Sequence, residues 1–440
     1  MTEFLVEGGH PISGTIVPSG NKNEALPVIA ATVAAGGPVT LENVPRIGDV
    51  HRQLAIVERL GARVEWRDEH TVVIDPAGVT GAEPDPALCG QIRASFLLAG
   101  ALLARRGEVR LPRPGGDRIG RRRVDTHLLA LGALGAEIEV DGGYRLRAPG
   151  GLRAAEIFLD EASVMATENA LIAAAGTKGE TVIYNAASEP HVQGLCRMLQ
   201  TLGAAIDGVG SNVLRVQGGP LRGGTHRIGP DHIEIGSFIG LAAVTGGALR
   251  IPGVRPADLR KIRMDFRRLG VRTEIEDDDL IVPGGQELAV QADIGGAIPK
   301  LDDAPWPGFP ADLTSIALVT ATQSRGTVLV HEKLFESRLF FVDRLIQMGA
   351  QIVLCDPHRA VVIGPSPLVG ATLSSPDIRA GMALLIAALA AQGQSLIQNV
   401  EQIDRGYEKI EERLAAVGAR LVRTSCWDGV DRRKDAPGEP

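Results

Sequence analysis

The densest group of chemically active side chains lies in the stretch 113–127, which reads Arg-Pro-Gly-Gly-Asp-Arg-Ile-Gly-Arg-Arg-Arg-Val-Asp-Thr-His. It carries five arginines, two acids and one histidine in a chain whose formal net charge is −7. Its glycines and proline predict a loop that can move. A basic loop in an acidic protein favours an anionic substrate, and the alternative is an ordinary solvated run of charge.

Near the N-terminus, the stretch 19–24 reads Ser-Gly-Asn-Lys-Asn-Glu and precedes an apolar helical pattern. Lys22 and Asn23 at a helix start, beside unbonded backbone N–H groups, form the kind of place where an anion binds. The alternative is a plain polar start to the helix, because Ser and Asn are common capping residues.

Single arginines recur at matching positions of the chain. Arg93 and Arg379 open apolar helical segments in the two halves, and Arg338 and Arg405 precede amphipathic ones. One such arginine would be structural. Several that converge from different segments bind phosphate or carboxylate groups with paired N–H donors.

The segment 307–313 reads Pro-Gly-Phe-Pro-Ala-Asp-Leu and places Asp312 at a helix start. Two prolines and a glycine make a rigid loop, and a rigidly placed carboxylate can serve as a general base. The alternative is that Asp312 only caps the helix that follows.

Several function classes are disfavoured. The sequence contains no G-x-x-x-x-G-K-[ST], H-E-x-x-H or G-x-S-x-G pattern, and its four cysteines lack metal-ligand spacing. The negative net charge argues against nucleic-acid binding, and the apolar runs are too short to span a bilayer. The first residues resemble no signal peptide, so a cytoplasmic location is expected.

The elements that must position these side chains are repeated. Leu-Gly-Ala or a close variant occurs six times, with glycines at 61, 135, 203, 270, 349 and 418, spaced 74, 68, 67, 79 and 69 residues apart. Such a period indicates copies of one supersecondary unit. Each glycine follows an amphipathic helical pattern and suits a left-handed helix cap.

Each unit also contains a second, apolar helical pattern upstream, as in 25–35 and 382–391, followed by glycine and a short strand. Such a helix is expected to be buried. The strands after the caps, such as 63–65, 137–140 and 351–354, alternate polar and apolar residues, which predicts one buried face and one wet face. Three units can pack their buried helices together with sheets outside, and 440 residues suffice for two such lobes.

Taken together, the motifs of residues 1–424 resemble the enolpyruvyl transferases. The resemblance implies a two-lobed inside-out α/β barrel with six βαβαββ repeats, three per lobe. It implies one lobe from residues 22–231 with a mobile loop 113–123, and a second from residues 1–21 plus 232–424. Residues 425–440 are expected to be a disordered tail. The motifs that carry the resemblance are Gly20-Asn21-Lys22-Asn23, Arg93-Ala94-Ser95, Pro114-Gly115-Gly116 with Ile119-Gly120, Phe309-Pro310-Ala311-Asp312, Asp377-Ile378-Arg379-Ala380 and Ile403-Asp404-Arg405-Gly406-Tyr407-Glu408.

Within this family, the motifs are most similar to those of members that use UDP-N-acetylglucosamine. This implies transfer of the enolpyruvyl group of phosphoenolpyruvate to the 3-hydroxyl of the sugar, with release of phosphate, as the first committed step of peptidoglycan synthesis. The implied route is addition followed by elimination, with no metal and no organic cofactor. The expected partners are these two small molecules, with neither nucleic acid nor membrane involved.

The resemblance also implies roles for individual residues. Asp117 is the expected proton donor and Asp312 the base, and Lys22 and Arg405 complete the catalytic set. Phosphoenolpyruvate is expected at Lys22, Arg122, Arg379 and Arg405. Asp377 and Glu336 are expected near the reacting carbons. The UDP-sugar is expected at Asn23, Arg93, Arg123, Val124, Asp125, Thr126, Ser163, Val164 and Asp312, and Leu334 completes the substrate-binding set.

The chain departs from the commonest family pattern in three places. Asp117 stands where many members carry cysteine; a partly buried carboxyl can still donate a proton, but it cannot be alkylated as a thiol can. Insensitivity to the epoxide antibiotic fosfomycin is therefore expected. Arg123 in place of proline and Asn21 in place of alanine affect nucleotide recognition. Arg123 leaves open a nucleoside monophosphate as the acceptor, whereas the loop signatures of enzymes that use shikimate 3-phosphate, the other alternative acceptor, are not found. A catalytically silent binding protein on the same scaffold is a further alternative, because a fold alone does not establish activity.

Overall fold

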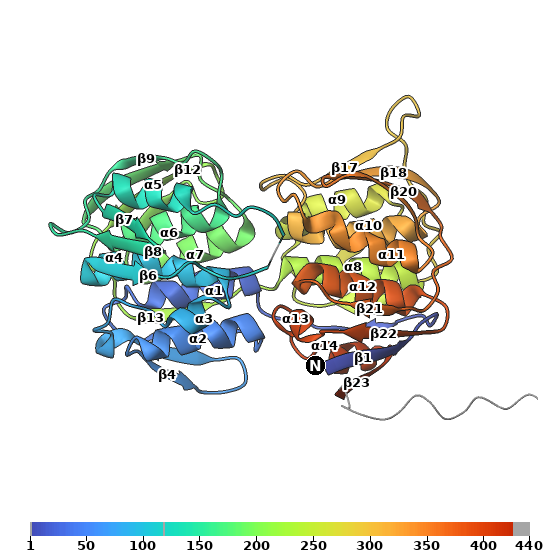
Figure 1. The fold of residues 1–440 in the computed structure, drawn as a ribbon, viewed down its shortest axis with the longest axis horizontal. Coiled ribbons are helices and arrows are strands. Elements are labelled where there is room, and N and C mark those ends of the chain that lie inside the picture. Colours follow the sequence, from blue (N-terminus) through green and yellow to red (C-terminus); the bar gives the residue numbers. More distant parts are fainter. Residues whose placement is uncertain (1, 118, 426–440) are drawn as a thin grey trace, which may run out of the picture.

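The computed structural model describes residues 2–117 and 119–425, and they form two lobes that lie side by side (Figure 1). Most of the segment expected to be a tail, residues 426–440, lies outside the described residues. Ser425 was assigned to that tail, but it is the last residue of the strand β23 (Arg420–Ser425). Among the described residues, no helix is both long enough and apolar enough to cross a membrane.

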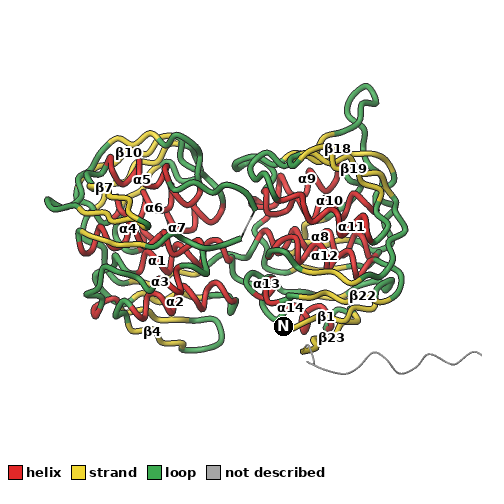
Figure 2. Tube along the Cα trace, in the orientation of Figure 1, coloured by secondary structure: helices red, strands yellow, loops and turns green. Residues whose placement is uncertain are grey.

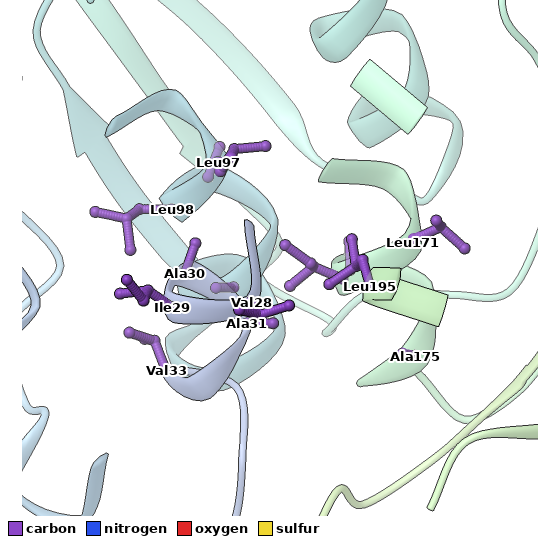
Figure 3. Close-up of a cluster of buried hydrophobic side chains, with 14 of the residues drawn as sticks. Val28, Ile29, Ala30, Ala31, Val33, Leu97, Leu98, Leu171, Ala175 and Leu195 are labelled. Carbon is purple, nitrogen blue, oxygen red and sulfur yellow. The ribbon is translucent and has the colours of Figure 1, made fainter. Parts of the chain in front are cut away.

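The first lobe is built around three apolar helices, α1 (Lys22–Thr32), α4 (Leu98–Arg106) and α6 (Val164–Ala175), which contact one another. Their side chains form one hydrophobic cluster rich in alanine, leucine, valine and isoleucine (Figure 3). Small alanines let these helices approach closely, which suits a chain with only 3% aromatic residues.

The sheets and outer helices of this lobe surround that centre. The outer helices are the amphipathic α2 (Gly48–Arg59) and α7 (Pro190–Thr201) and the largely apolar α5 (Asp125–Ala133), which lacks the predicted polar face; a short α3 (Pro86–Cys89) precedes α4. The three sheets, in strand order, are β13 (Gly224–Arg227), β3 (Val39–Glu42), β5 (Val72–Asp75), β4 (Arg63–Trp66); β6 (Glu108–Leu111), β8 (Gly143–Arg147), β7 (Glu137–Asp141); and β11 (Ala205–Asp207), β12 (Val213–Gly218), β10 (Gly179–Tyr184), β9 (Glu156–Phe158).

The second lobe repeats this plan around α8 (His232–Thr245), α10 (Thr314–Gln323) and α12 (Ile378–Ala390). Its outer helices are α9 (Arg260–Arg268), α11 (Val342–Gln347), α13 (Glu401–Asp404) and α14 (Ile410–Ala415). Its sheets, in strand order, are β15 (Glu274–Glu276), β16 (Asp279–Val282), β14 (Leu249–Ile251), β2 (Gly14–Thr15); β17 (Lys300–Asp302), β18 (Gly326–His331), β20 (Arg359–Gly364), β19 (Gln351–Asp356); and β21 (Thr372–Ser374), β22 (Gln394–Gln398), β1 (Thr2–Glu7), β23.

The predicted architecture is confirmed. Helices lie at the centre of each lobe and strands at its periphery (Figure 2). The order β9-α6-β10-α7-β11-β12 shows one complete βαβαββ unit. The sheet β6-β8-β7 has three strands where the other five have four, so among the described residues that unit lacks its leading strand.

The chain passes between the lobes twice. β1 and β2 come first in the sequence, but they pair with β22, β23 and β14 of the second lobe, and β13 pairs in parallel with β3 of the first. The two crossing segments lie against each other: Gly20 and Pro230 form an isolated bridge, and the N–H of Asn21 donates to the carbonyl of Gly229 over 2.8 Å. Lys22 therefore begins α1 directly at the joint between the lobes.

The six repeat glycines cap helices as predicted, because each has a φ between 91° and 115°. The strands after them differ from one another. β4 and β19 alternate between exposed and partly buried residues, but β7 is exposed on both faces, with Ile138 38% and Val140 62% exposed. The predicted buried face of β7 is wrong: all five of its residues are exposed, in the described sheet that has three strands where the others have four.

Two of these glycines offer a matched test of the caps. Replacing Gly61 or Gly135 with alanine forces a left-handed backbone onto a residue with a side chain, at about 1–2 kcal/mol. A Cβ added to Gly61 would also lie 2.2 Å from the carbonyl oxygen of Gly78, which is too close. A Cβ added to Gly135 would have the side chain of Arg153 as its nearest neighbour, at an ordinary contact distance of 3.7 Å. We expect both variants to lower the thermal unfolding midpoint, and Gly61→Ala to lower it more. Equal effects would contradict the role assigned to this contact.

Candidate active site

A cavity of about 270 Å³ lies between the lobes, at the joint where the chain crosses. Its walls include residues of α1, the 113–123 loop, α6 and the 304–312 loop. The start of α12 and Arg405, which directly follows α13, also line it. Eleven of the residues singled out from the sequence line it: Lys22, Asn23, Arg93, Asp117, Arg122, Val164, Asp312, Leu334, Arg338, Arg379 and Arg405. The others lie around it: Arg123, Val124, Asp125, Thr126, Ser163, Glu336 and Asp377.

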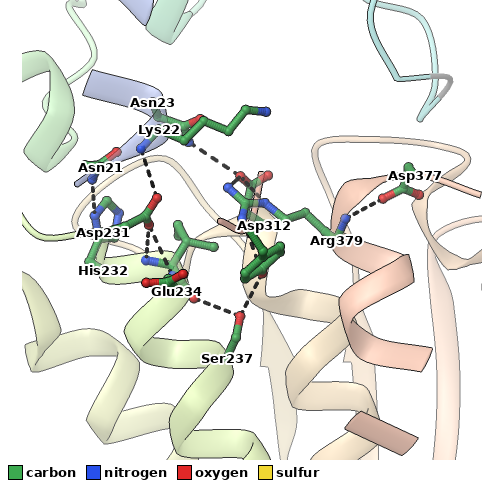
Figure 4. Close-up of polar contacts among 12 residues, drawn as sticks. Asn21, Lys22, Asn23, Asp231, His232, Glu234, Ser237, Asp312, Asp377 and Arg379 are labelled. Atoms are coloured by element: carbon green, nitrogen blue, oxygen red, sulfur yellow. Dashed lines mark hydrogen bonds and ion pairs between the residues drawn. The ribbon is translucent and has the colours of Figure 1, made fainter. Parts of the chain in front are cut away.

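The start of α1 is fastened to the second lobe (Figure 4). The side chain of Asn21 accepts from the N–H of Glu24 over 3.1 Å, and its amide nitrogen lies 3.0 Å from Nδ1 of His232. The N–H of Lys22 donates to Asp231 over 3.0 Å. The backbone N–H groups of Lys22 and Glu24, which a helix start could offer to an anion, are thus already bonded within the protein. The group that α1 presents to an anion in the cavity is the Lys22 ammonium.

Asp49 holds together cations from both lobes. Its carboxylate lies 3.0 Å from the Lys22 ammonium and 2.9 Å from Nε of Arg405, and only 4% of the residue is exposed. Burial alone would raise the pKa of Asp49, but the charges of Lys22 and Arg405 outweigh it and hold that pKa below its usual range. Arg405 also pairs with Asp117, Nη1 to Oδ1, at 2.5 Å.

Asp312 forms the second charged cluster. Its carboxylate oxygens lie 2.9 Å from Arg379 and 3.0 Å from Arg338, and the amide of Asn23 approaches to 3.5 Å from the other lobe. The side chain makes no helix cap, because the residues that cap the local helices, Pro310 and Leu313, have no side-chain cap bond. Asp312 is therefore a charged residue of the cavity, held by its rigid loop, and it does not cap a helix.

The pair of arginines changes what Asp312 can do. Burial works to raise the pKa of Asp312, but the guanidinium groups of Arg379 and Arg338 lower it far below its usual range. A carboxylate stabilised in this way is a weak base. It can take a proton from a substrate only after one of the arginines has moved to another anion.

Asp377 and Glu336 support neighbouring parts of the cavity. Asp377 caps α12 by accepting from the N–H groups of Arg379 and Ala380 over 2.8 and 3.0 Å, and burial raises its pKa. Glu336 accepts from the N–H of Arg121 over 3.0 Å. Neither side chain lines the central cavity.

The 113–123 loop reaches from the first lobe to the second. Besides the pairing of Asp117 with Arg405, the N–H of Ser337 donates to the carbonyl of Ile119 over 3.0 Å. At the loop's end, one nitrogen of Arg93 donates to the carbonyls of Arg122 and Arg123, both over 2.8 Å. Arg93 therefore holds the loop in place as well as lining the cavity.

The residues after the loop form a polar network beside the cavity. Arg123 pairs with Asp125 at 2.9 Å and with Asp160 at 3.4 Å, and the hydroxyl of Thr126 donates to Asp160 over 2.6 Å. Ser163 caps α6. The sequence analysis placed these residues at the acceptor, and the structure places them next to the cavity rather than in its wall.

The sequence did not single out several other residues of the cavity wall, among them Asp49, Glu168, Glu189, His191 and Trp306. Asp49 lies in the first turn of an amphipathic helix, where an acid is expected for the helix dipole alone. Glu168 gave a usable signal, because it is the one acid in the otherwise uncharged segment 164–175. A charged residue in a buried helix needs a partner or a function.

The chemistry of the cavity suits a multiply charged anion. Lys22, Arg122, Arg338, Arg379 and Arg405 face it from both lobes, with Asp49, Asp117 and Asp312 among them. The one group of possible metal ligands found among the described residues, Glu69, His70 and Glu408, does not line the cavity.

Comparison with known proteins places these observations in a family. The family model described as EPSP synthase (3-phosphoshikimate 1-carboxyvinyltransferase) matches residues 6–414. A protein of Bradyrhizobium diazoefficiens named UDP-N-acetylglucosamine 1-carboxyvinyltransferase is 58% identical, over 96% of this chain and 98% of its own length. A Treponema denticola protein of the same name is 55% identical, over 96% and 99%.

Solved structures agree in fold. The enolpyruvyl transferase NikO from Streptomyces tendae superposes with a TM-score of 0.85 at 27% identity, over 96% of this chain and 99% of that one. An EPSP synthase from Acinetobacter baumannii gives 0.72 at 18% identity, over 97% and 100%. The second likeness is one of fold alone.

The charge environment of Asp312 predicts how stability depends on pH. Above the unfolded pKa of aspartate, about 3.9, the paired carboxylate stabilises the fold in full. Below it the unfolded chain takes up a proton that the folded chain does not, because the folded pKa is depressed. Stability is therefore lost as the pH falls, by up to about 1.4 kcal/mol per pH unit.

Asp312→Asn removes this contribution. We expect the variant to be less stable than the wild type at neutral pH, and the difference between the two thermal unfolding midpoints to start narrowing near about pH 4 and to keep narrowing as the pH falls further. Asp141→Asn, at an exposed position of β7, controls for the substitution itself. Parallel midpoint curves for wild type and Asp312→Asn would contradict the assignment.

Proposed function

The chain belongs to the EPSP synthase family of enolpyruvyl transferases, and from this premise we propose how its cavity works. The reaction is transfer of an enolpyruvyl group to UDP-N-acetylglucosamine, the acceptor that names relatives 49–58% identical over 96% of the chain. The observation that carries the proposal is the interlobe cavity, in which Lys22 and Arg405 meet on Asp49 beside Asp117. The donor we propose is phosphoenolpyruvate.

On the donor side, Lys22, Arg122, Arg379 and Arg405 bind the phosphate and carboxylate of phosphoenolpyruvate. Arg405 now pairs with both Asp49 and Asp117. When the donor's anionic groups bind Arg405, they displace Asp117, which is then no longer held as the guanidinium's counter-ion. The freed carboxylate takes up a proton from water and delivers it to the methylene carbon of the donor, so that the adjacent carbon becomes electrophilic.

On the acceptor side, the sugar's 3-hydroxyl lies at Asp312. Binding of the donor anion by Arg379 weakens that residue's hold on Asp312 and so restores basicity to the carboxylate. Asp312 takes the hydroxyl proton as the oxygen attacks the electrophilic carbon, which gives a tetrahedral ketal. Loss of phosphate and of a methyl proton then yields the enol ether.

Other acceptors find less support. Arg123 is the residue that suggests a nucleoside monophosphate as the acceptor. Its guanidinium is already paired with Asp125 and Asp160, so it is not free to bind a phosphate. The likeness to EPSP synthase is one of fold and does not extend to shikimate 3-phosphate. A catalytically silent binding protein would not need every charged residue of the catalytic set. Lys22, Asp117, Asp312 and Arg405 are all present in this chain.

We also propose a cytoplasmic location. Three cysteines among the described residues, Cys89, Cys196 and Cys355, are free thiols. Free thiols are typical of a reducing compartment.

The first test is phosphate release from phosphoenolpyruvate with one acceptor at a time. We expect turnover with UDP-N-acetylglucosamine and none with shikimate 3-phosphate or UMP. Asp117→Asn keeps the shape of the side chain but cannot donate the proton, so we expect a loss of about 100-fold or more in kcat. Acceptor binding, followed by calorimetry, should persist and so shows that the variant is folded. Undiminished turnover in Asp117→Asn would remove Asp117 as the acid.

The second test concerns fosfomycin. The epoxide alkylates a thiol in family members that have cysteine at the position of Asp117, so the wild type should stay active after incubation with the compound. Asp117→Cys should become sensitive, with inactivation that phosphoenolpyruvate slows. Time-dependent loss of wild-type activity at stoichiometric fosfomycin would contradict the expectation.

A further inference from the structure

At the inner end of the cavity, two glutamates lack the partners that buried carboxyl groups need. Glu168 is on α6 and is 2% exposed, and its Oε1 has no hydrogen-bond partner. Glu189 immediately precedes α7; its Oε2 also has none. Nδ1 of His191, two residues further on, is unpartnered as well. All three residues line the cavity.

Their positions continue the acceptor side of the cavity. Glu168 follows Val164 by four residues on α6, so both lie on one face of the helix, and Met165 lines the cavity beside them. Val164 is one of the residues assigned to the UDP-sugar. The same helix face therefore leads from the proposed nucleotide-sugar site to the Glu168 carboxyl.

The second lobe closes this end of the cavity. The N–H of Trp306 donates to Oε1 of Glu189 over 3.2 Å, and the hydroxyl of Ser188 donates to the Trp306 carbonyl over 3.3 Å. Trp306 belongs to the tight loop that ends at Asp312, closed by a bond from the N–H of Ala304 to the carbonyl of Phe309 over 3.1 Å. One short loop thus connects the proposed position of the reacting hydroxyl with the two glutamates.

Leaving buried carboxyl oxygens unbonded destabilises a protein, and natural structures rarely do so without a function. Burial raises the pKa of Glu168, and the neighbouring Glu189 raises it further; burial also raises the pKa of Glu189. A carboxyl that keeps its proton both donates and accepts a hydrogen bond. A sugar hydroxyl has the same two capacities and is the complementary partner.

We propose that Glu168 and Glu189 bind ring hydroxyl groups of the acceptor sugar other than the one that reacts, and so select the acceptor. The inference rests on the proposed function, because the sugar is placed by its 3-hydroxyl at Asp312. Glu168 makes the direct contact. Glu189, fixed by Trp306, completes the subsite when the lobes are together.

The test compares Glu168→Leu and Glu168→Gln with the wild type. Loss of a buried hydrogen bond to the acceptor predicts a KM for UDP-N-acetylglucosamine that rises about tenfold or more in Glu168→Leu, while the KM for phosphoenolpyruvate stays unchanged. Glu168→Gln keeps a donor and an acceptor at this position and should restore most of the affinity. The wild-type KM for the acceptor should also rise at alkaline pH, where the carboxyl loses its proton, and that of Glu168→Gln should not.

Stability separates a ligand contact from a structural one. Glu168→Leu removes an unpartnered carboxyl from an apolar helix, so its thermal unfolding midpoint should equal or exceed that of the wild type. Leu171→Val on the same helix removes a methylene from the core and should lower the midpoint without changing either KM. Figure 3 shows Leu171 among the core side chains.

An acceptor KM in Glu168→Leu within twofold of the wild type would overturn the proposal, as would a lowered midpoint together with a rise in both KM values. Wild-type turnover with UDP-N-acetylglucosamine is measured first and reports separately on the proposed function. If the wild type does not turn over this acceptor, the function is wrong; if it does and the variant is normal, only the subsite is wrong.

Discussion

The structure depends on the neutralisation of crowded cations by two carboxylates of the interlobe cavity, the buried Asp49 and the partly buried Asp312. Asp49, from the first lobe, joins Lys22 to Arg405 of the second. Asp312, from the second lobe, holds Arg338 and Arg379 and reaches Asn23 of the first. In a cavity of low dielectric, like charges this close repel strongly unless counter-ions lie between them. The same contacts that let the cations come together also connect the lobes, so an anionic substrate competes with the protein's own carboxylates.

The repeated architecture explains why this cluster forms at one place. The buried helices α1, α8 and α12 begin at the polar residues Asn21, Asp231 and Asp377, and residues at all three starts line the interlobe cavity. The double crossing brings the starts of α1 and α8 together, through Asn21 with His232 and Lys22 with Asp231 (Figure 4). Residues far apart in the sequence thus obtain fixed positions from rigid elements, and only the 113–123 loop adds a charged group from a long irregular segment.

The sequence predicts the repeated structural units far better than it predicts which side chains contact one another. A glycine that follows a helical pattern and precedes an alternating one, such as Gly61, predicts a helix cap from the local sequence alone. The six units and the outer sheets could therefore be inferred without knowledge of their surroundings. The exposure of both faces of β7 does not follow from its alternating pattern, because the burial of a strand face depends on what packs against it. The importance of Asp49 and Glu189 is equally hidden, because it arises only when Arg405 and Trp306 arrive from the other lobe. Single arginines were found because they recur at matching positions.

The aspartate at position 117 changes the electrostatics of the loop as well as its chemistry. A neutral thiol there would leave Arg405 with Asp49 as its one carboxylate among those described here. The carboxylate of Asp117 adds a second, at 2.5 Å, and with the bond from Ser337 to Ile119 it attaches the loop to the opposite lobe. The contact between this loop and the opposite lobe is therefore stabilised by the residue that we propose as the acid. Donor binding to Arg405 would release Asp117, so the ion pair links proton delivery to the presence of the donor and discourages the loop acid from acting on an empty site.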